Sequence, residues 1–218
     1  MPSVLTSTSS FKSATLGHVV VLDDEHSILS VLQEYLTLKG YECDTFDSAN
    51  AFCDWLDQSV DKMPQPVCLL CDVSMPGMTG LGLQARLASR ADIAMVLMSG
   101  AASNQDVVTA FRAGAVDFLL KPLDDNLLFS ALDRGLSHSR QMKQQLQREA
   151  HYRALAAKLT SRELDTLRRV AQGRLNRQIA DEFGIALRTV KLYRQRGFEK
   201  LGIELNVELV RLFDEGYL

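Results

Sequence analysis

Along residues 18–136, short apolar runs alternate with stretches in which apolar residues recur every three or four positions. The runs predict strands at 19–22, 42–46, 67–71, 95–99 and 118–120, and the periodic stretches predict helices near 28–36, 49–58, 80–89, 104–113 and from 124 onward. Parallel strands joined by helices need right-handed crossovers, which place helices on both faces of the sheet. The pattern therefore predicts an α/β fold with a doubly wound, five-stranded parallel sheet.

The remainder of the chain has only helical patterns. Residues 137–157 are rich in Gln and Arg and lack Pro and Gly, which indicates a helical linker that extends the preceding helix; the heptads are too few to favour a coiled-coil seam. A capping box from Thr160 to Glu163 begins a helix that reaches Gly173, and further helices are predicted near 176–183, 188–201 and 207–213. A short turn containing Gly184 joins two of them, as in a helix-turn-helix unit. We therefore expect a tail at 1–16, an α/β domain at 17–136, the linker at 137–157 and an all-α four-helix domain at 158–218.

Composition and charge narrow the class of protein. Apolar residues make up 46% of the chain and charged residues 23%, with no apolar run long enough to span a membrane. The first 16 residues lack the apolar segment of a signal peptide, which favours a disordered tail and a cytoplasmic protein. Residues 1–157 carry a net charge of −6 and residues 158–218 a net charge of +3. The basic end is therefore the place where a polyanion would bind.

Cys68 and Cys71 have the spacing of a redox or metal-binding pair. They lie in a predicted strand, where a spacing of three places the two sulfur atoms on opposite faces of the sheet. Neither one disulfide nor one zinc site can be built that way. We interpret the cysteines as small buried residues of a protein in a reducing compartment.

Polar residues follow the predicted strands at their carboxyl ends, where open parallel sheets bind ligands. These residues are Asp23, Asp24, Asp72, Ser99 and Lys121. Carboxylates that converge at one edge repel one another unless a cation neutralises them, and Mg²⁺ is the natural oxygen-bound cation. One carboxylate can then attack a phosphoryl group while the metal, a hydroxyl and an ammonium stabilise the charge that develops.

Each of these residues, and Phe118 in the last predicted strand, also has an ordinary structural interpretation. An Asp after a strand can cap the next helix, Ser99 can form a turn, Phe118 can be a core residue and Lys121 can be a solvated loop charge. Their joint occurrence at successive strand ends favours the phosphoryl site.

The first domain resembles the receiver domain of response regulators, a flavodoxin-like fold, over about residues 18–136. The motifs that carry the resemblance are VLDDE at 21–25, CDVSMPGMTG at 71–80, MSGA at 98–101 and AGAVDFLLKP at 113–122. The resemblance implies that Asp72 accepts a phosphoryl group and that Lys121 pairs with it. It also implies a Mg²⁺ site and a switch pair; the metal would be held by Asp23, Asp24, Asp72 and the backbone carbonyl of Ser74, and the switch residues would be Ser99 and Phe118.

The last domain resembles the LuxR/FixJ-type helix-turn-helix over about residues 159–213. The matching segments are LTSRELDTL at 159–167, AQG at 171–173, NRQIA at 176–180, RTVK at 188–191 and KLGI at 200–203. The resemblance implies base contacts by Lys191, Leu192 and Gln195, and backbone contacts by Asn176, Arg188, Thr189, Arg194 and Arg196. Two positions depart from the family. Ala186 replaces the usual capping Ser or Thr, at a cost of about 1 kcal/mol, and Tyr193 replaces a common His, where we expect a core residue that packs inward with Val190 and Leu201.

The two resemblances together imply a two-component response regulator, a DNA-binding transcription factor rather than an enzyme. Its partners would be a sensor histidine kinase and double-stranded DNA, with a homodimer formed on phosphorylation and no membrane association. One alternative is a constitutive DNA-binding protein with a scaffold receiver. Another is a phosphohydrolase that uses Asp72, although Ser74 stands where one such class needs a second Asp.

Overall fold

The computed structural model describes residues 15–59, 66–101 and 103–218. The predicted tail at 1–16 lies outside the described residues except for Thr15 and Leu16. The chain divides into two compact units, and the division falls between Lys143 and Gln144. No helix among the described residues is both long enough and apolar enough to cross a membrane.

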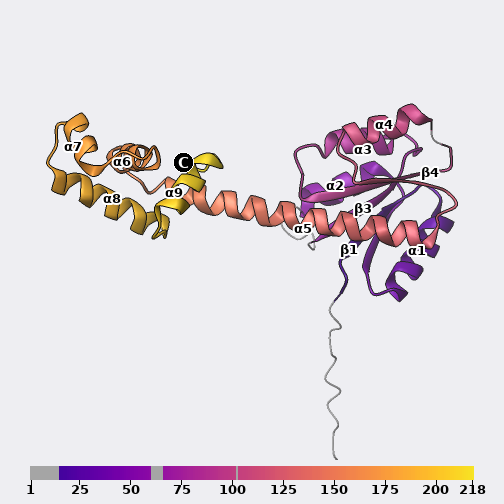
Figure 1. Cartoon of the computed structure of the whole chain (residues 1–218). Coiled ribbons are helices and arrows are strands. Elements are labelled where there is room, and N and C mark those ends of the chain that lie inside the picture. Colours follow the sequence, from indigo (N-terminus) through magenta and orange to yellow (C-terminus); the bar gives the residue numbers. More distant parts are fainter. Residues whose placement is uncertain (1–14, 60–65, 102) are drawn as a thin grey trace, which may run out of the picture. The chain divides into compact units, whose positions relative to one another are not determined.

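The first unit is built on a parallel sheet with the strand order β2-β1-β3-β4-β5 (Figure 1). The strands are β1 (His18–Leu22), β2 (Glu42–Phe46), β3 (Val67–Asp72), β4 (Ile93–Ser99) and β5 (Asp117–Leu120). This order confirms the predicted doubly wound sheet, in which the direction of winding changes between β1 and β3. β4 begins two residues earlier than predicted because Ile93 pairs with Val67, so that the whole of β3 is matched.

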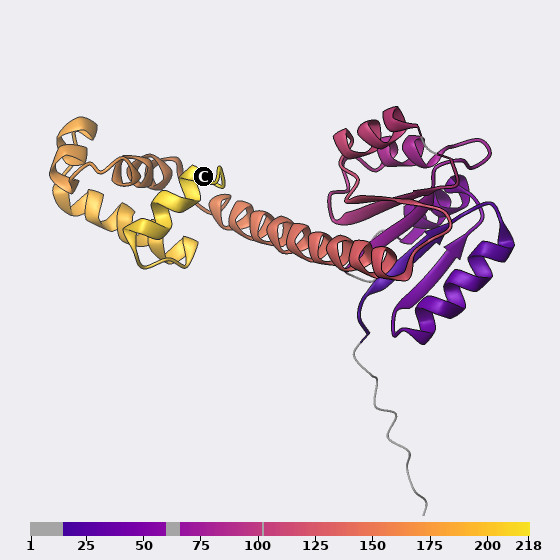
Figure 2. The same cartoon turned by 45° about the vertical axis from the view of Figure 1, so that its right-hand side comes forward.

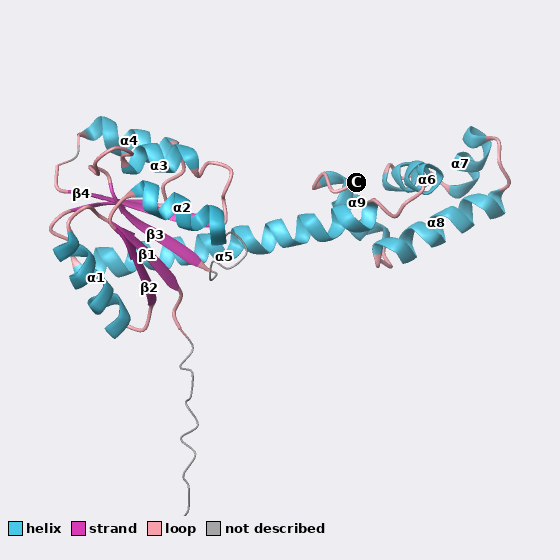
Figure 3. Ribbon diagram, turned by 180° about the vertical axis from the view of Figure 1, so that it is seen from behind, coloured by secondary structure: helices cyan, strands magenta, loops and turns pink. Residues whose placement is uncertain are grey.

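Helices cover both faces of the sheet (Figure 3). They are α1 (His26–Leu38), α2 (Ala49–Ser59), α3 (Gly80–Arg86), α4 (Asn104–Arg112) and α5 (Asp125–Ala156). The core on one face contains residues of α2, α3 and α4, and the core on the other contains residues of α1 and α5. Cys71 belongs to the first core and Cys68 to the second, and both thiols are free. Burial raises the pKa of the Cys68 thiol to about 12. The prediction of small buried residues is confirmed for Cys53, Cys68 and Cys71, whereas Cys43 is half-buried.

α5 lies close against β3 at Gly135. A Cβ atom at this position would stand 2.5 Å from the Sγ atom of Cys68. The helix continues without a break beyond this contact to Ala156, as Figure 2 shows. Its last turns supply Tyr152 and Leu155, which pack on the core of the second unit.

The second unit consists of these turns and four further helices, as predicted. They are α6 (Ser161–Ala171), α7 (Asn176–Phe183), α8 (Leu187–Leu201) and α9 (Asn206–Asp214). Gly184 ends α7 in the left-handed conformation, with φ of 63°, and turns the chain toward α8. The core contains Leu167 of α6 and Val190 of α8.

The prediction that Tyr193 packs inward was wrong. Tyr193 is half-buried and lies outside the core of the second unit. The inward face of α8 passes instead through Val190, Gly197 and Leu201, which are all buried. Gly197 allows this close approach, because a Cβ atom there would stand 2.8 Å from the Cδ1 atom of Leu167.

Candidate functional site

Three of the predicted site residues meet at the carboxyl edge of the sheet. Asp23 follows β1, Asp72 ends β3 and Lys121 follows β5. The Nζ atom of Lys121 lies 2.6 Å from Oδ2 of Asp23 and 2.6 Å from Oδ1 of Asp72. The Asp23 side chain is 0% exposed and that of Asp72 is 7% exposed, so both carboxylates are shielded from water.

The charges of this cluster do not cancel within the protein. One ammonium faces two buried carboxylates, which leaves a formal charge of −1 among the three groups. Burial lowers the pKa of Lys121, but its hydrogen bonds to Asp23 and Asp72 more than offset that effect, so its pKa lies above the ordinary value. Lys121 is therefore a permanent cation at neutral pH. The remaining negative charge of the cluster favours the binding of a further cation.

Backbone amides occupy the other two carboxylate oxygens. The Glu25 amide donates to Oδ1 of Asp23 at 3.0 Å, and the Ser74 amide donates to Oδ2 of Asp72 at 2.6 Å. Each of the two carboxylates is thus held between Lys121 and the loop that follows its own strand. This arrangement fixes the direction in which Asp72 presents its oxygens.

Ser99, Phe118 and Asp24, the other predicted residues of this site, have different contacts, and Asp24 is not grouped with Asp23 and Asp72 as a metal ligand among the described residues. The Ser99 hydroxyl donates to the Ala101 carbonyl at 3.1 Å, and the Ser99 carbonyl accepts from the Lys121 amide at 2.8 Å. Phe118 is half-buried and packs on the core under α2, α3 and α4. Asp24 is exposed, and with Ser74 it lines a cavity of about 550 Å³.

The two carboxylates of this site fit Mg²⁺ better than a metal that needs three or more side-chain ligands. Among the described residues, no three His, Cys, Asp or Glu side chains are grouped so that they could hold a metal. Mg²⁺ commonly keeps several waters and needs only one or two carboxylates. Asp23 and Asp72 supply two carboxylates with a formal charge that Lys121 only partly neutralises.

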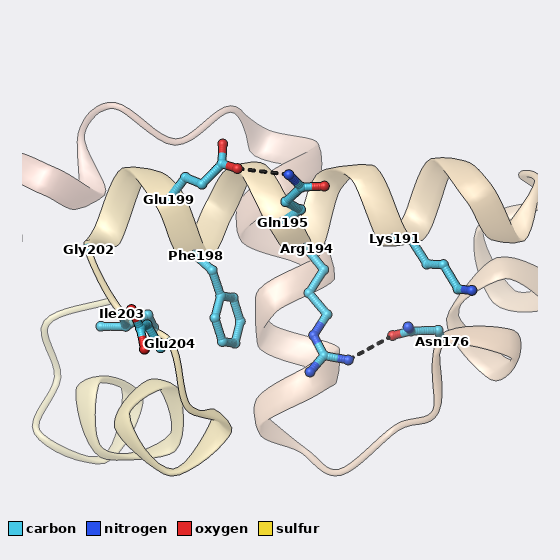
Figure 4. A pocket seen from close by; sticks show the side chains of 9 residues that line it. All are labelled: Asn176, Lys191, Arg194, Gln195, Phe198, Glu199, Gly202, Ile203 and Glu204. Atoms are coloured by element: carbon cyan, nitrogen blue, oxygen red, sulfur yellow. Dashed lines mark hydrogen bonds between the residues drawn. The ribbon is translucent and has the colours of Figure 1, made fainter.

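The predicted DNA-contacting residues lie on α8 and at the start of α7. Five of them are exposed and three are half-buried; the exposed ones are Arg188, Lys191, Leu192, Gln195 and Arg196, and the others are Asn176, Thr189 and Arg194. Figure 4 shows several of them around an open cavity of about 700 Å³.

Arg194 has its contacts within the protein. Its Nη2 atom donates to Asn206 of α9 at 2.9 Å, and its Nη1 atom lies 3.5 Å from the side-chain oxygen of Asn176. The guanidinium also lies over the Phe198 ring, 5.5 Å from the ring centre. Arg194 therefore links α8 to the first residues of α7 and α9.

Comparison with known proteins decides the family. Residues 19–133 match the response regulator receiver domain, and residues 157–213 match the bacterial regulatory proteins of the luxR family. The chain belongs to the response-regulator family. A receiver joined to a LuxR-type domain makes it a transcriptional regulator of the two-component type and implies a histidine kinase and DNA as its partners.

Curated relatives of this response regulator match it along most of their length. It is 32% identical over 195 residues to the response regulator protein TmoT of Ectopseudomonas mendocina. This match covers 89% of this chain and 86% of TmoT. It is 32% identical over 202 residues to the transcriptional regulatory protein FixJ of Bradyrhizobium diazoefficiens, which covers 91% of this chain and 95% of FixJ. Both relatives are named as regulators.

Two solved structures of response regulators match most of this chain. The response regulator StyR matches with a TM-score of 0.77 and 33% identity, over 91% of this chain and 98% of StyR. Full-length FixJ from B. japonicum matches with a TM-score of 0.52 and 32% identity, over 94% of this chain and 99% of FixJ.

Two features of the helix-turn-helix unit bear on the sequence analysis of this regulator. Ala186 occupies the N-cap of α8 and makes no side-chain capping bond, which confirms the expected missing cap. The sequence identified Glu163 as a capping residue, but not its partly buried ion pair with Lys200, in which Nζ lies 2.6 Å from Oε2. The two residues are 37 positions apart, and no local pattern links them.

Proposed function

We propose that Asp72 accepts a phosphoryl group from a sensor histidine kinase and that this controls the binding of double-stranded DNA by α8. The observation that carries the proposal is the position of Lys121 Nζ, 2.6 Å from both Asp23 and Asp72. An ammonium at this distance from a nucleophilic carboxylate is placed to bind the oxygens of a phosphoryl group attached to it.

The transfer converts Asp72 from an anion into an acyl phosphate. A carboxylate oxygen of Asp72 attacks phosphorus, the phosphorus–nitrogen bond of the kinase phosphohistidine breaks, and the histidine nitrogen keeps the electron pair. Lys121 would stay anchored by Asp23 while its ammonium turns from Asp72 to the phosphoryl oxygens. Asp23, Asp72 and the Ser74 carbonyl would hold Mg²⁺, which when bound neutralises charge on the phosphoryl oxygens. Asp24 would have to move toward them, because the three Asp side chains are not grouped as metal ligands in this structure.

Ser99 and Phe118 would pass the change to the surface of the receiver. To donate to the phosphoryl group, the Ser99 hydroxyl must give up its bond to the Ala101 carbonyl. Because Ser99 pairs with Leu120 in the sheet, Ser99 and Phe118 face the same side, toward α4. We infer that their rearrangement reshapes the surface of α4, β5 and α5, through which two copies would form a homodimer.

The proposed domains are a receiver at 17–136, a helical linker at 137–157 and a DNA-binding domain at 158–218. The packing of Tyr152 and Leu155 on the second unit favours counting the last turns of the linker with the DNA-binding domain. A histidine kinase and DNA as partners favour a cytoplasmic location, which we include in the proposal.

Labelling with radioactive acetyl phosphate tests the phosphoacceptor. We expect the full chain to be labelled in the presence of Mg²⁺, and the label to be lost on chelation of Mg²⁺ and in Asp72→Asn. Asp54→Asn is the matched control, because Asp54 is exposed on α2 and the charge change is the same. A label that persists in Asp72→Asn would contradict the assignment.

DNA footprinting tests the regulation. Stronger protection by the phosphorylated chain than by the unphosphorylated chain would support the proposal. Footprints of equal strength would favour the constitutive DNA-binding protein, and steady hydrolysis of a phosphate ester would favour the phosphohydrolase.

A further inference from the structure

Three residues on one side of α8 stand four positions apart, at Lys191, Gln195 and Glu199. All three are exposed and line the open cavity shown in Figure 4. The Nε2 atom of Gln195 donates a hydrogen bond to Oε1 of Glu199 at 2.8 Å. Side chains with this spacing are neighbours on a helix surface, so the bond is compatible with an undistorted α8.

This bond fixes which end of the Gln195 amide faces the surroundings. The amide group of glutamine has one donor end and one acceptor end, whereas an ionised carboxylate only accepts. Glu199 can therefore bind only the nitrogen end of Gln195, and the opposite orientation would bring two acceptor oxygens together. Figure 4 shows the Gln195 oxygen on the side away from Glu199.

We propose that Glu199 is a positioning residue that makes Gln195 select a DNA base with an exocyclic amino group. The inference rests on the proposed DNA-binding role of α8. In the major groove, adenine and cytosine present an amino donor, whereas guanine and thymine present acceptor oxygens at the corresponding place. An oriented Gln195 oxygen accepts from the first two bases and meets an unfavourable acceptor on the other two. The second hydrogen on Nε2 remains available for the N7 atom of adenine.

Without Glu199 the selection would weaken. A free amide can turn either end toward the groove, so it can accept from an amino group or donate to a carbonyl oxygen. Lys191, one turn before Gln195, carries only donors and favours guanine whatever Glu199 does. The effect of Glu199 is thus confined to the base that Gln195 contacts.

Selection from randomised double-stranded DNA tests this inference. It uses the full chain phosphorylated with acetyl phosphate and Mg²⁺, and the bound pool is sequenced. Gln195→Ala identifies the position that Gln195 contacts, as the position where base preference is lost. Glu199→Met removes the acceptor at similar size, and Glu199→Gln restores a neutral acceptor. Glu204→Met is the matched control, since Glu204 lines the same cavity and loses the same charge.

We expect the wild type to favour adenine or cytosine at the Gln195 position. In Glu199→Met the ratio of these bases to guanine and thymine should fall by about threefold or more at that position alone. Glu199→Gln should lie between the two, and Glu204→Met should keep the wild-type ratio. Three results would overturn this inference but not the proposed function. They are an unchanged ratio in Glu199→Met, an equal loss in Glu204→Met, and a preference for guanine or thymine in the wild type. Failure of the wild type to select any sequence would overturn the proposed function, and the inference with it.

Discussion

Replacing Gly135 by Ala sets helix propensity against packing, and the two effects have opposite signs. Ala is more favourable than Gly inside a helix by about 1 kcal/mol. At Gly135, however, the new Cβ atom would lie 2.5 Å from Sγ and 3.3 Å from Cβ of Cys68. Cys68 is 0% exposed in β3 and cannot move aside without disturbing the sheet.

The structure predicts that packing dominates. Forcing one extra carbon atom into a filled core costs about 1–3 kcal/mol, and an overlap with a rigid strand belongs at the upper end. After the gain in helix propensity is subtracted, Gly135→Ala should destabilise the receiver by about 2 kcal/mol. Gly82 in α3 is the matched control, because a Cβ atom there meets nothing closer than 3.4 Å. Gly82→Ala should be neutral or stabilising.

Urea unfolding followed by tryptophan fluorescence measures the difference. Trp55 is the single tryptophan of the chain and packs on the core of the receiver, so its signal reports this unit. The unfolding midpoint of Gly135→Ala should fall by about 1 M urea. Adding Cys68→Ala should recover part of the loss, because the overlapping Sγ atom is removed. A midpoint at or above that of the wild type would refute the steric argument.

Two further predictions concern the stability of the second unit. Ala186→Ser should stabilise α8 by about 1 kcal/mol, because the introduced hydroxyl can accept from the Thr189 amide; slower hydrogen exchange across α8 checks this, and unchanged exchange would contradict it. Burial raises the pKa of Glu163, but hydrogen bonds from Lys200 and Thr160 more than offset that effect, so its pKa lies below the ordinary value. A carboxyl group whose folded pKa is lowered stabilises the protein above its unfolded pKa, and this contribution is lost as pH falls through the folded pKa. Glu163→Gln should therefore lower the stability of the second unit at pH 7 by about 2 kcal/mol and remove this acid-sensitive component. Hydrogen exchange measures the free energy of unfolding of the wild type and of Glu163→Gln at each pH. If it changes with pH in the same way in both, Glu163 is not the source of the acid-sensitive component.

The local sequence pattern was sufficient to predict the parallel sheet and the charged residues at its carboxyl edge. Strands of one parallel sheet end at the same edge, so Asp23, Asp72 and Lys121 could be expected to meet once the strands were recognised. The same reasoning separates Cys68 from Cys71, because alternate residues of a strand face opposite sides. Both inferences use only geometry that repeats along a strand.

The local sequence pattern could not predict contacts between helices that are distant in the sequence. Periodicity shows that α8 has an apolar side, but α8 also packs closely against Leu167 of α6 at Gly197, a residue without a side chain. Tyr193 was expected to pack inward with Val190 and Leu201, whereas the buried positions are set by the rotation of α8 against Leu167. The glycine is explained only when the partner helix is known.

The number of cations in the second unit also does not tell which of them are free to contact DNA. A count of cations treats Arg194 as equivalent to Arg188, yet Arg194 directs two nitrogens toward Asn176 and Asn206 and covers Phe198, whereas Arg188 is exposed. Each phosphate that a cation neutralises adds to the salt dependence of binding. In the proposed binding of DNA by α8, the exposed cations of this helix would therefore determine that dependence more than the total charge does. Arg194 would contribute by holding α8 between its neighbours.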